Sequence, residues 1–361
     1  MVTLPIGTRL DNADETVELL ASKFNRHTFW CGQSGSGKTY ALGVVLEQLL
    51  LKTELPLLIL DPNADFVRLH ETRAGAATES ATAISQSDIR VLHSTHAGGE
   101  RLHASFVNLS PASKAAVLQL DPIADAEEYN VLLHLEGDVS AFNDAEFLTR
   151  LRQSDDPGAR RLALRIENLQ TLEWPLWARG AETATQIADQ RPRATVMDLG
   201  GFANPAAPKV AALSVLEHLW ARRDERRPVL IVIDEAHNIC PPESTTLVER
   251  ALTEQIIQIA AEGRKFGLWL LLSTQRPTKI HPNVLSQCDN LALMRMNAPR
   301  DLAEVAQVFG FVPAELLSQS PAFAQGQALF AGGFVAQPTL TQMGARITEE
   351  GGSDVPVPLK V

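Results

Sequence analysis

Short apolar runs alternate with longer amphipathic stretches along most of this chain. Each apolar run has the length of a strand and is followed by polar or turn residues, which predicts a series of buried β-strands. These runs are His27–Cys31, Leu55–Leu60, Ala194–Leu199, Val229–Asp234, Leu268–Thr274 and Asn290–Met296. Leucines and valines recur at helical spacing in stretches that follow many of them, at 38–51, 209–222, 244–261 and 299–309. This alternation predicts an α/β fold with a mostly parallel sheet that helices cover on both faces.

Residues 64–193 interrupt the alternation. Short strands are predicted at Ile89–His93 and Leu102–Leu109, but helix start signals dominate the rest. Ser110–Pro111 and Asp156–Pro157 each place an N-capping side chain before a proline, which suits the first helical position. We therefore expect a mostly helical insertion over 64–193.

The insertion divides the remaining chain into two parts of one predicted core, residues 1–63 and 194–345. Near its end, 327–331 and 334–341 predict a terminal hairpin around two glycines. The polar, proline-containing residues that follow predict a flexible tail over 346–361.

Composition narrows the functional classes. The 361 residues carry a formal net charge of −11 with a pI near 5.3, which argues against nucleic-acid binding over the whole surface. A local basic patch, or a pore lined by several subunits, stays compatible with this charge. Three separated cysteines suit neither a disulfide scaffold nor a CxxC zinc site. No apolar run approaches the ~20 residues of a membrane span, and no leader pattern opens the chain. We therefore expect a cytoplasmic protein without membrane contact.

A glycine-rich loop carries the strongest chemical signal. It fits the pattern G-x-x-x-x-G-K-[ST], and it follows one predicted strand and opens the next predicted helix. Its residues are Gly32, Gln33, Ser34, Gly35, Ser36, Gly37, Lys38 and Thr39. Backbone N–H groups in such a loop point at phosphate oxygens, while Lys38 reaches the β- and γ-phosphates and the Thr39 hydroxyl ligates Mg²⁺. The loop predicts a nucleotide site.

Two carboxylates end the apolar run at 229–233. Ligands of open α/β sheets bind at the carboxyl ends of the strands. Asp234 is therefore predicted to hold Mg²⁺, and Glu235 to act as the general base on the attacking water. Taken alone, the pair would also fit an acidic helix start.

The letters Asp-Glu-Ala-His at 234–237 also spell the motif of two-lobed helicases. Strands of the first sheet already occupy the residues after His237, so we expect no second lobe. The chain also lacks an Asn-Lys-x-Asp guanine-reading motif, which favours ATP over GTP. It lacks the Leu-Ser-Gly-Gly-Gln signature as well, which argues against a transporter ATPase.

A set of short motifs in this order resembles the HerA-type ATPases of the HerA/FtsK superfamily. The matching stretches are Leu60–Asn63, Val196–Leu199, Ile233–Asn238, Glu262–Gly267, Leu272–Pro277 and Ser286–Asn290. The resemblance covers about 27–62 and 194–345. It implies a RecA-like P-loop NTPase core, a hexameric ring, and translocation on double-stranded DNA beside a nuclease or another effector.

The resemblance also implies roles for three further residues. Gln275, at the end of its strand, resembles the polar sensor of the γ-phosphate or the water. Arg264, which we expect to begin that strand, resembles the arginine finger supplied to a neighbouring subunit. Gln275 could instead cap the turn at Pro277, Arg264 could be a solvated cation at a helix end, and Asp61 could either tune Mg²⁺ or start its Asp-Pro turn.

Archaeal members of the family carry an N-terminal β-barrel, and the few residues before Gly32 lead us to expect none here. We carry three hypotheses: a DNA-translocating motor, a nucleotide-dependent hexameric scaffold or switch that licenses an effector, for example in anti-phage defence, and a conjugative-secretion motor. DNA-stimulated ATP turnover separates the first from the second. The partner, the polarity and the ring size stay open.

Overall fold

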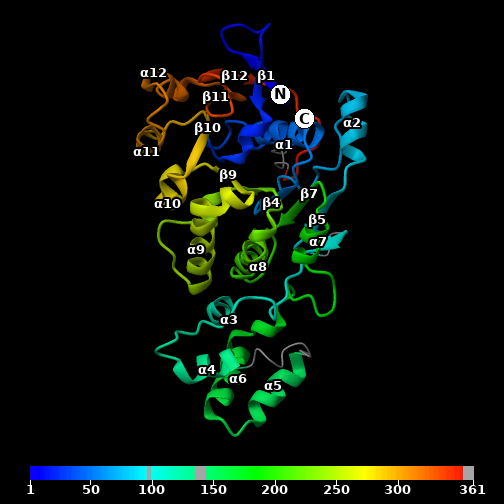
Figure 1. Ribbon diagram of the computed structural model, residues 1–361, viewed down its shortest axis with the longest axis vertical. Coiled ribbons are helices and arrows are strands. Elements are labelled where there is room, and N and C mark those ends of the chain that lie inside the picture. The colour runs from blue at the N-terminus through cyan, green and yellow to red at the C-terminus, as the bar shows by residue number, and fades with distance from the viewer. Residues whose placement is uncertain (96–98, 135–143, 353–361) are drawn as a thin grey trace, which may run out of the picture.

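The computed structural model describes residues 1–95, 99–134 and 144–352. Over these ranges, twelve strands form one sheet in the order β2-β1-β12-β11-β10-β3-β9-β8-β4-β7-β5-β6 (Figure 1). The strands are β1 (Thr3–Arg9), β2 (Thr16–Leu20), β3 (His27–Cys31), β4 (Leu57–Asp61), β5 (Ile89–His93), β6 (Glu100–Arg101), β7 (Ala194–Asp198), β8 (Val229–Ile233), β9 (Leu268–Thr274), β10 (Cys288–Met294), β11 (Gln327–Gly332) and β12 (Thr339–Met343).

The sheet has a parallel part and an antiparallel edge. Neighbouring strands run parallel from β10 through β3, β9, β8, β4, β7 and β5 to β6. On the other side of β10, the strands β11, β12, β1 and β2 are antiparallel. The predicted α/β class is confirmed. The terminal hairpin is also present, although its second strand covers Thr339–Met343 rather than 334–341. The strands β1 and β2 form a further hairpin within the core range 1–63.

Helices lie on both faces of the parallel strands because successive apolar side chains point to opposite sides. In β8, Ile231 and Ile233 join the hydrophobic core under α8 and α9, whereas Leu230 and Val232 join the core under α1. The helices are α1 (Lys38–Lys52), α2 (Thr78–Ser85), α3 (Pro111–Val117), α4 (Ala126–His134), α5 (Asp144–Gln153), α6 (Pro157–Leu169), α7 (Ala184–Gln190), α8 (Ala207–Ala221), α9 (Leu247–Glu262), α10 (Pro282–Leu285), α11 (Pro299–Val308) and α12 (Ala314–Leu317).

The 64–193 segment contributes both to the sheet and to a separate helical cluster. The helices α3 to α6 lie beyond α8 and α9, at the end of the molecule that is lowest in Figure 1. Strand β5, in contrast, pairs in parallel with β7 through Val91 and Val196, as the sequence predicts for Ile89–His93. The segment is therefore interleaved with the core along this edge of the sheet.

The strand expected at Leu102–Leu109 is wrong. Only an isolated bridge from Ala104 to Trp177 forms there, and Asn108 N donates to Ser105 O in a turn. The apolar spacing that suggested a strand arises because Leu102, Phe106 and Leu109 are buried in the core without strand pairing. Tertiary packing alone thus explains the pattern.

The two predicted helix starts in this segment are confirmed. The Ser110 side chain accepts a hydrogen bond from Ser113 N at 3.1 Å, and Asp156 Oδ1 accepts one from Gly158 N at 2.8 Å. In both helices, the residue after the cap is proline. Each cap satisfies a backbone donor that the helix itself leaves free.

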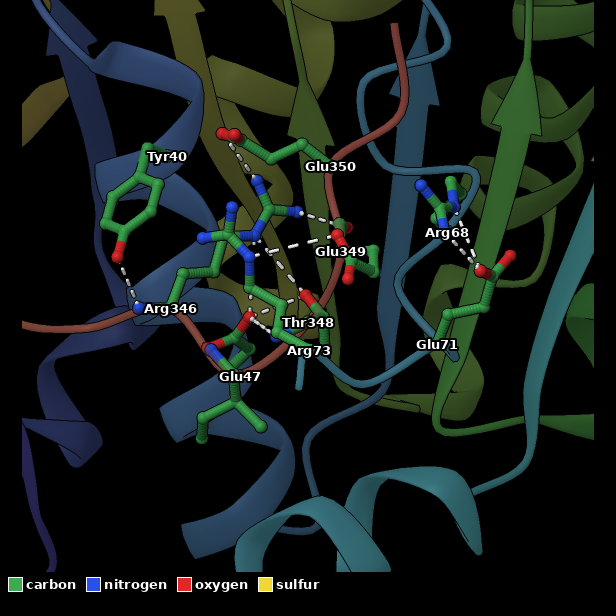
Figure 2. Close-up of polar contacts among 10 residues, drawn as sticks. Tyr40, Glu47, Arg68, Glu71, Arg73, Arg346, Thr348, Glu349 and Glu350 are labelled. Carbon is green, nitrogen blue, oxygen red and sulfur yellow. Dashed lines mark hydrogen bonds and ion pairs between the residues drawn. The ribbon is translucent and has the colours of Figure 1, made fainter. Parts of the chain in front are cut away.

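The end of the described chain is a packed segment, which we call the strap (residues 344–352). The flexible tail expected from residue 346 is wrong for this part, and 353–361 lie outside the described residues. The Arg346 side chain is fully buried, with Nε 3.5 Å from Glu47 Oε1, also fully buried (Figure 2). A buried guanidinium requires such a partner, so the strap is held where the composition suggested disorder.

Glu47, on α1, also binds the strap backbone. Its carboxylate accepts hydrogen bonds from Ile347 N and Thr348 N, both at 2.8 Å, and from the Thr348 hydroxyl at 2.6 Å. Burial raises the pKa of Glu47, against these hydrogen bonds and the charge of Arg346. A Cβ added at Gly43, one turn earlier, would lie 2.5 Å from Arg346 Nε. The glycine therefore gives the guanidinium its path across α1.

We predict that Arg346→Ala lowers the free energy of unfolding by about 3–5 kcal/mol, because it leaves the buried Glu47 carboxylate without its cation. Urea denaturation followed by circular dichroism measures this change. Arg68→Ala is the matched control: Arg68 also pairs with a glutamate, Glu71, but both side chains are more than 40% exposed (Figure 2). Its midpoint should barely move. Equal shifts in the two variants would contradict a special role for the buried pair.

Candidate functional site

The phosphate loop (residues 32–39) connects β3 to α1 at the carboxyl edge of the parallel strands. Gly35 and Gly37 have φ values of +72° and +86°, a region that side chains with a Cβ rarely adopt. Arg295, directly after β10, fixes the loop: Gln33 N donates to Arg295 O at 2.8 Å, and the Arg295 guanidinium donates to Gly35 O at 2.9 Å. The predicted strand–loop–helix context is present.

Lys38 lies at the centre of a buried polar cluster. Its Nζ is 2.9 Å from Asp234 Oδ1, 3.3 Å from Glu235 Oε1 and 2.8 Å from Ser273 Oγ. Burial disfavours the charged ammonium, but the neighbouring carboxylates of Asp234 and Glu235 outweigh it and raise the pKa of Lys38. The loop lysine and both carboxylates at the end of β8 are therefore brought together, as the sequence predicts.

Glu235 is held from two further elements. Gln275, which follows β9, donates from Nε2 to Glu235 Oε1 at 2.6 Å, and His237 Nδ1 lies 3.1 Å from Oε2. Burial opposes ionisation, but the His237 contact, the charge of Lys38 and the Gln275 hydrogen bond lower the pKa of Glu235 to about 2. Glu235 also has a φ of +42°, and strained backbone of this kind concentrates at functional sites.

A cluster of carboxylates offers oxygen ligands beside the loop. Oxygen atoms of Asp61, Asp65 and Asp234 all lie within 4.8 Å of one another. Asp234 is fully buried, and its Oδ2 has no hydrogen-bond partner among the described residues. The Thr39 hydroxyl lies 3.5 Å from Asp65 Oδ2. An unsatisfied buried carboxylate oxygen calls for a partner, and hard oxygen ligands suit Mg²⁺. The residues present thus fit this ion.

The Asp61 carboxylate binds backbone N–H groups of the turn that follows β4. Its two carboxylate oxygens accept hydrogen bonds from Asp65 N at 3.0 Å and Phe66 N at 2.8 Å. Burial raises the pKa of Asp61 to about 7 and that of Asp65 to about 6. Of the two roles considered for Asp61, this geometry favours ordering the turn after β4, which carries Asp65 into the cluster.

A cavity of about 660 Å³ opens beside the phosphate loop. Its lining includes the loop and Gln275, together with residues near β11, β12 and the strap. These last residues are Gln325, Gly326, Gln342, Met343, Gly344, Ala345 and Glu350. Sequence reasoning missed them, as it missed Asp65, Arg295 and the contacts of Ser273 and His237. No motif marks the lining residues, because only the pairing of β12 at the antiparallel edge brings them to the loop.

Arg264 lies apart from these groups. It belongs to a 3₁₀ turn over Gly263–Phe266, just before β9 and not within it, whereas Gln275 follows the other end of that strand. Its Nη1 donates to Asp289 Oδ2 at 2.7 Å, and its side chain is 38% exposed. The phosphate loop lies at the carboxyl ends of the parallel strands. Arg264 lies at their amino ends, on the opposite side of the sheet from the loop of its own chain.

This α/β fold, with a glycine-rich loop and two carboxylates at the end of a nearby parallel strand, defines a P-loop nucleoside triphosphatase. The chain belongs to the family described as "Helicase HerA, central domain", which matches residues 4–216, more than half of the sequence. The family resemblance seen in the motifs is confirmed, and membership implies hydrolysis of a nucleoside triphosphate. A second family, "Zonular occludens toxin (Zot)", matches residues 183–297.

Curated relatives are similar over limited stretches. A probable helicase of Methanocaldococcus jannaschii is 31% identical over 133 residues, which are 37% of this chain and 25% of that protein. The "DNA double-strand break repair helicase HerA" of Sulfurisphaera tokodaii is 33% identical over 127 residues, 35% of this chain and 25% of that protein. The matched stretch is thus a quarter of the length of each relative.

Solved structures share the fold over nearly the whole chain. VirB4 of Thermoanaerobacter pseudethanolicus has a TM-score of 0.63 at 14% identity and covers 95% of this chain and 97% of its own. The bacterial conjugative coupling protein TrwB has a TM-score of 0.60 at 11% identity and covers 97% of this chain and 90% of its own. None of the helices in the described ranges combines the length and apolar character that a membrane span requires.

We predict that Lys38→Ala weakens ATP binding by about 10- to 100-fold, because the phosphates lose one charge-assisted hydrogen bond. Titration with a fluorescent ATP analogue measures the affinity. Lys52→Ala, at the other end of α1, is the control for losing a lysine from the same helix and should bind like the parent. Parent-like affinity in a folded Lys38→Ala sample would show that the phosphates bind elsewhere.

Proposed function

We propose that this chain is an ATP-hydrolysing motor of HerA type that forms a hexameric ring and translocates on double-stranded DNA, together with a nuclease or another effector protein. The observation that carries this proposal is the contact of Lys38, Asp234, Glu235 and Gln275 at one edge of the sheet, in a chain of the HerA family. Curated relatives of the chain are named as DNA repair helicases, which supports DNA as the polymer along which the motor moves.

In this proposal the phosphate loop binds the triphosphate through its backbone N–H groups, and Lys38 neutralises the β- and γ-phosphates. Thr39 and Asp234 hold Mg²⁺, with Asp65 close to both. The bound ion supplies positive charge against the phosphate oxygens.

Glu235 acts on the attacking water. Its lowered pKa of about 2 keeps it ionised, so it can accept a hydrogen bond from that water and orient it toward the γ-phosphate. Gln275, just after β9, and His237, in the turn after β8, fix the carboxylate. Gln275 is thereby placed to sense the γ-phosphate through the same carboxylate.

DNA-stimulated hydrolysis tests the function. ATP turnover should rise with double-stranded DNA of unrelated sequences, and DNA binding should weaken steeply with salt, because the contacts are to phosphates. Glu235→Gln should bind ATP yet lose turnover, which separates hydrolysis from binding. ATP-dependent assembly with no DNA binding, or with flat salt dependence, would favour a nucleotide-dependent scaffold instead.

The position of Arg264 supports a role across a subunit boundary. Phosphoryl transfer builds charge on the γ-phosphate oxygens, and an arginine finger from outside is worth roughly 10³–10⁵ in rate. Arg264 is partly exposed at the edge of the sheet away from its own phosphate loop. We propose that a ring presents it to the nucleotide of a neighbour.

We predict that Arg264→Ala binds ATP normally and hydrolyses it poorly, and that lysine rescues little because it lacks the planar fork. Mixing inactive Arg264→Ala with inactive Lys38→Ala should restore part of the turnover, since some interfaces then pair an intact loop with an intact finger. Co-purification of two tags verifies subunit exchange. Arg9→Ala, which removes an arginine paired with Asp11, is the control.

Full activity of Arg264→Ala alone would contradict the finger assignment. Mixed rings that form and stay inactive would mean that Arg264 acts within its own chain or that every interface must be intact.

A further inference from the structure

The cavity beside the phosphate loop has two chemically different walls. One wall is the loop itself, with Lys38 and Thr39. The other is formed by the end of β12 and the strap, where Gln342, Ala345 and Glu350 line the same space. The second wall carries a carboxylate and an amide and offers no lysine or arginine to the cavity.

The second wall is tied to the loop by hydrogen bonds. Gly326 N donates to Ser36 O in the loop at 2.9 Å, and Met343 N donates to Gly326 O at 2.8 Å. On the strap, Arg346 N donates to the hydroxyl of Tyr40, two residues after Lys38, at 2.8 Å (Figure 2). The two walls therefore form one unit.

Ion pairs of the buried Arg346 side chain also anchor the strap. Arg346 pairs with Glu47 of α1, and its Nη1 lies 3.1 Å from Glu350 Oε1. Gly351 N donates to Asp65 O at 3.1 Å, which links the strap to the carboxylate cluster. Glu350 and Ala345 thus face the cavity from a segment that is anchored at several points.

The chemistry of this wall does not suit phosphates. Glu350 is paired with Arg346, so this wall brings no excess positive charge to a polyphosphate, whereas its carboxylate and amide groups can form hydrogen bonds with hydroxyl and ring nitrogen groups. In dinucleotide-binding folds, an acidic side chain binds the ribose hydroxyls, which shows that a carboxylate suits this part of a nucleotide. The cavity of about 660 Å³ is within the range of small-molecule pockets.

We propose that the end of β12 and the strap form the nucleoside-binding half of the site, which holds the ribose and base of the nucleotide. This inference rests on the nucleotide site proposed above. It makes Gln342, Ala345 and Glu350 binding residues for the uncharged part of the ligand, with Tyr40 as the link to the loop.

The test compares ATP with inorganic tripolyphosphate by calorimetry. Ala345 is exposed and lines the cavity, so we expect Ala345→Phe to fold like the parent and to place its ring in the nucleoside half. It should weaken ATP binding by about tenfold or more, because the larger side chain excludes the ligand, and leave tripolyphosphate binding unchanged. Ala336→Phe makes the same change at an exposed alanine of the β11–β12 loop, outside the cavity, and should bind both ligands like the parent.

Unchanged ATP affinity in Ala345→Phe would overturn the inference, and so would an equal loss for both ligands. Lys38→Ala tests the proposed nucleotide site itself, because it should weaken the binding of both ligands. If it weakens the binding of neither, the whole nucleotide site is wrong and not only its nucleoside half. Hydrogen exchange in the parent protein gives an independent readout. ATP should slow exchange at 344–350 more than tripolyphosphate does, because only ATP contacts the strap; equal protection by both ligands would count against the proposal.

Discussion

The site depends on the charge balance around one buried ammonium. Asp234 and Glu235 are nearly inaccessible to water, and two buried carboxylates at one strand end repel each other unless a cation lies between them. Lys38 is that cation, and it comes from a loop rather than from the strand that carries the acids. The relative position of β3 and β8, with β9 between them, is therefore set by electrostatics as well as by packing.

The parallel strands and the antiparallel edge make different contributions to the cavity. Parallel pairing of β3, β9 and β8 aligns their carboxyl ends, so residues that follow different strands converge at one edge. The antiparallel strands bring residues from the last quarter of the sequence to the same loop. The strap then crosses α1 and reaches the turn that carries Asp65. Two topological parts of one sheet thus enclose a single space.

Most of the parallel core is predictable from sequence because its strands are short apolar runs with a motif residue at the end. The contact between Lys38 and Asp234, and that between Glu235 and Gln275, follow from this placement. The strap is not predictable in this way. Its glutamates and arginine at 346–350 look like a solvated tail, and the burial of Arg346 depends on Glu47, which lies 300 positions before Ile347. The segment around Leu102–Leu109 fails for a related reason, since core packing produced its apolar spacing.

The pairing of Tyr40 with Arg346 joins residues 306 positions apart, and this fixes an order of events during synthesis. The helices α3 to α6 are close in sequence and can begin to pack while the ribosome is still working. Strand β3, in contrast, has β9 and β10 as its neighbours, and the hairpin of β1 and β2 can join the sheet only when β12 is present. Non-local pairings of this kind form late because loop closure precedes any gain in contacts. The cavity beside the phosphate loop is therefore completed only after the strap has emerged from the ribosome, and shorter nascent chains expose the apolar faces of an unfinished sheet to chaperones.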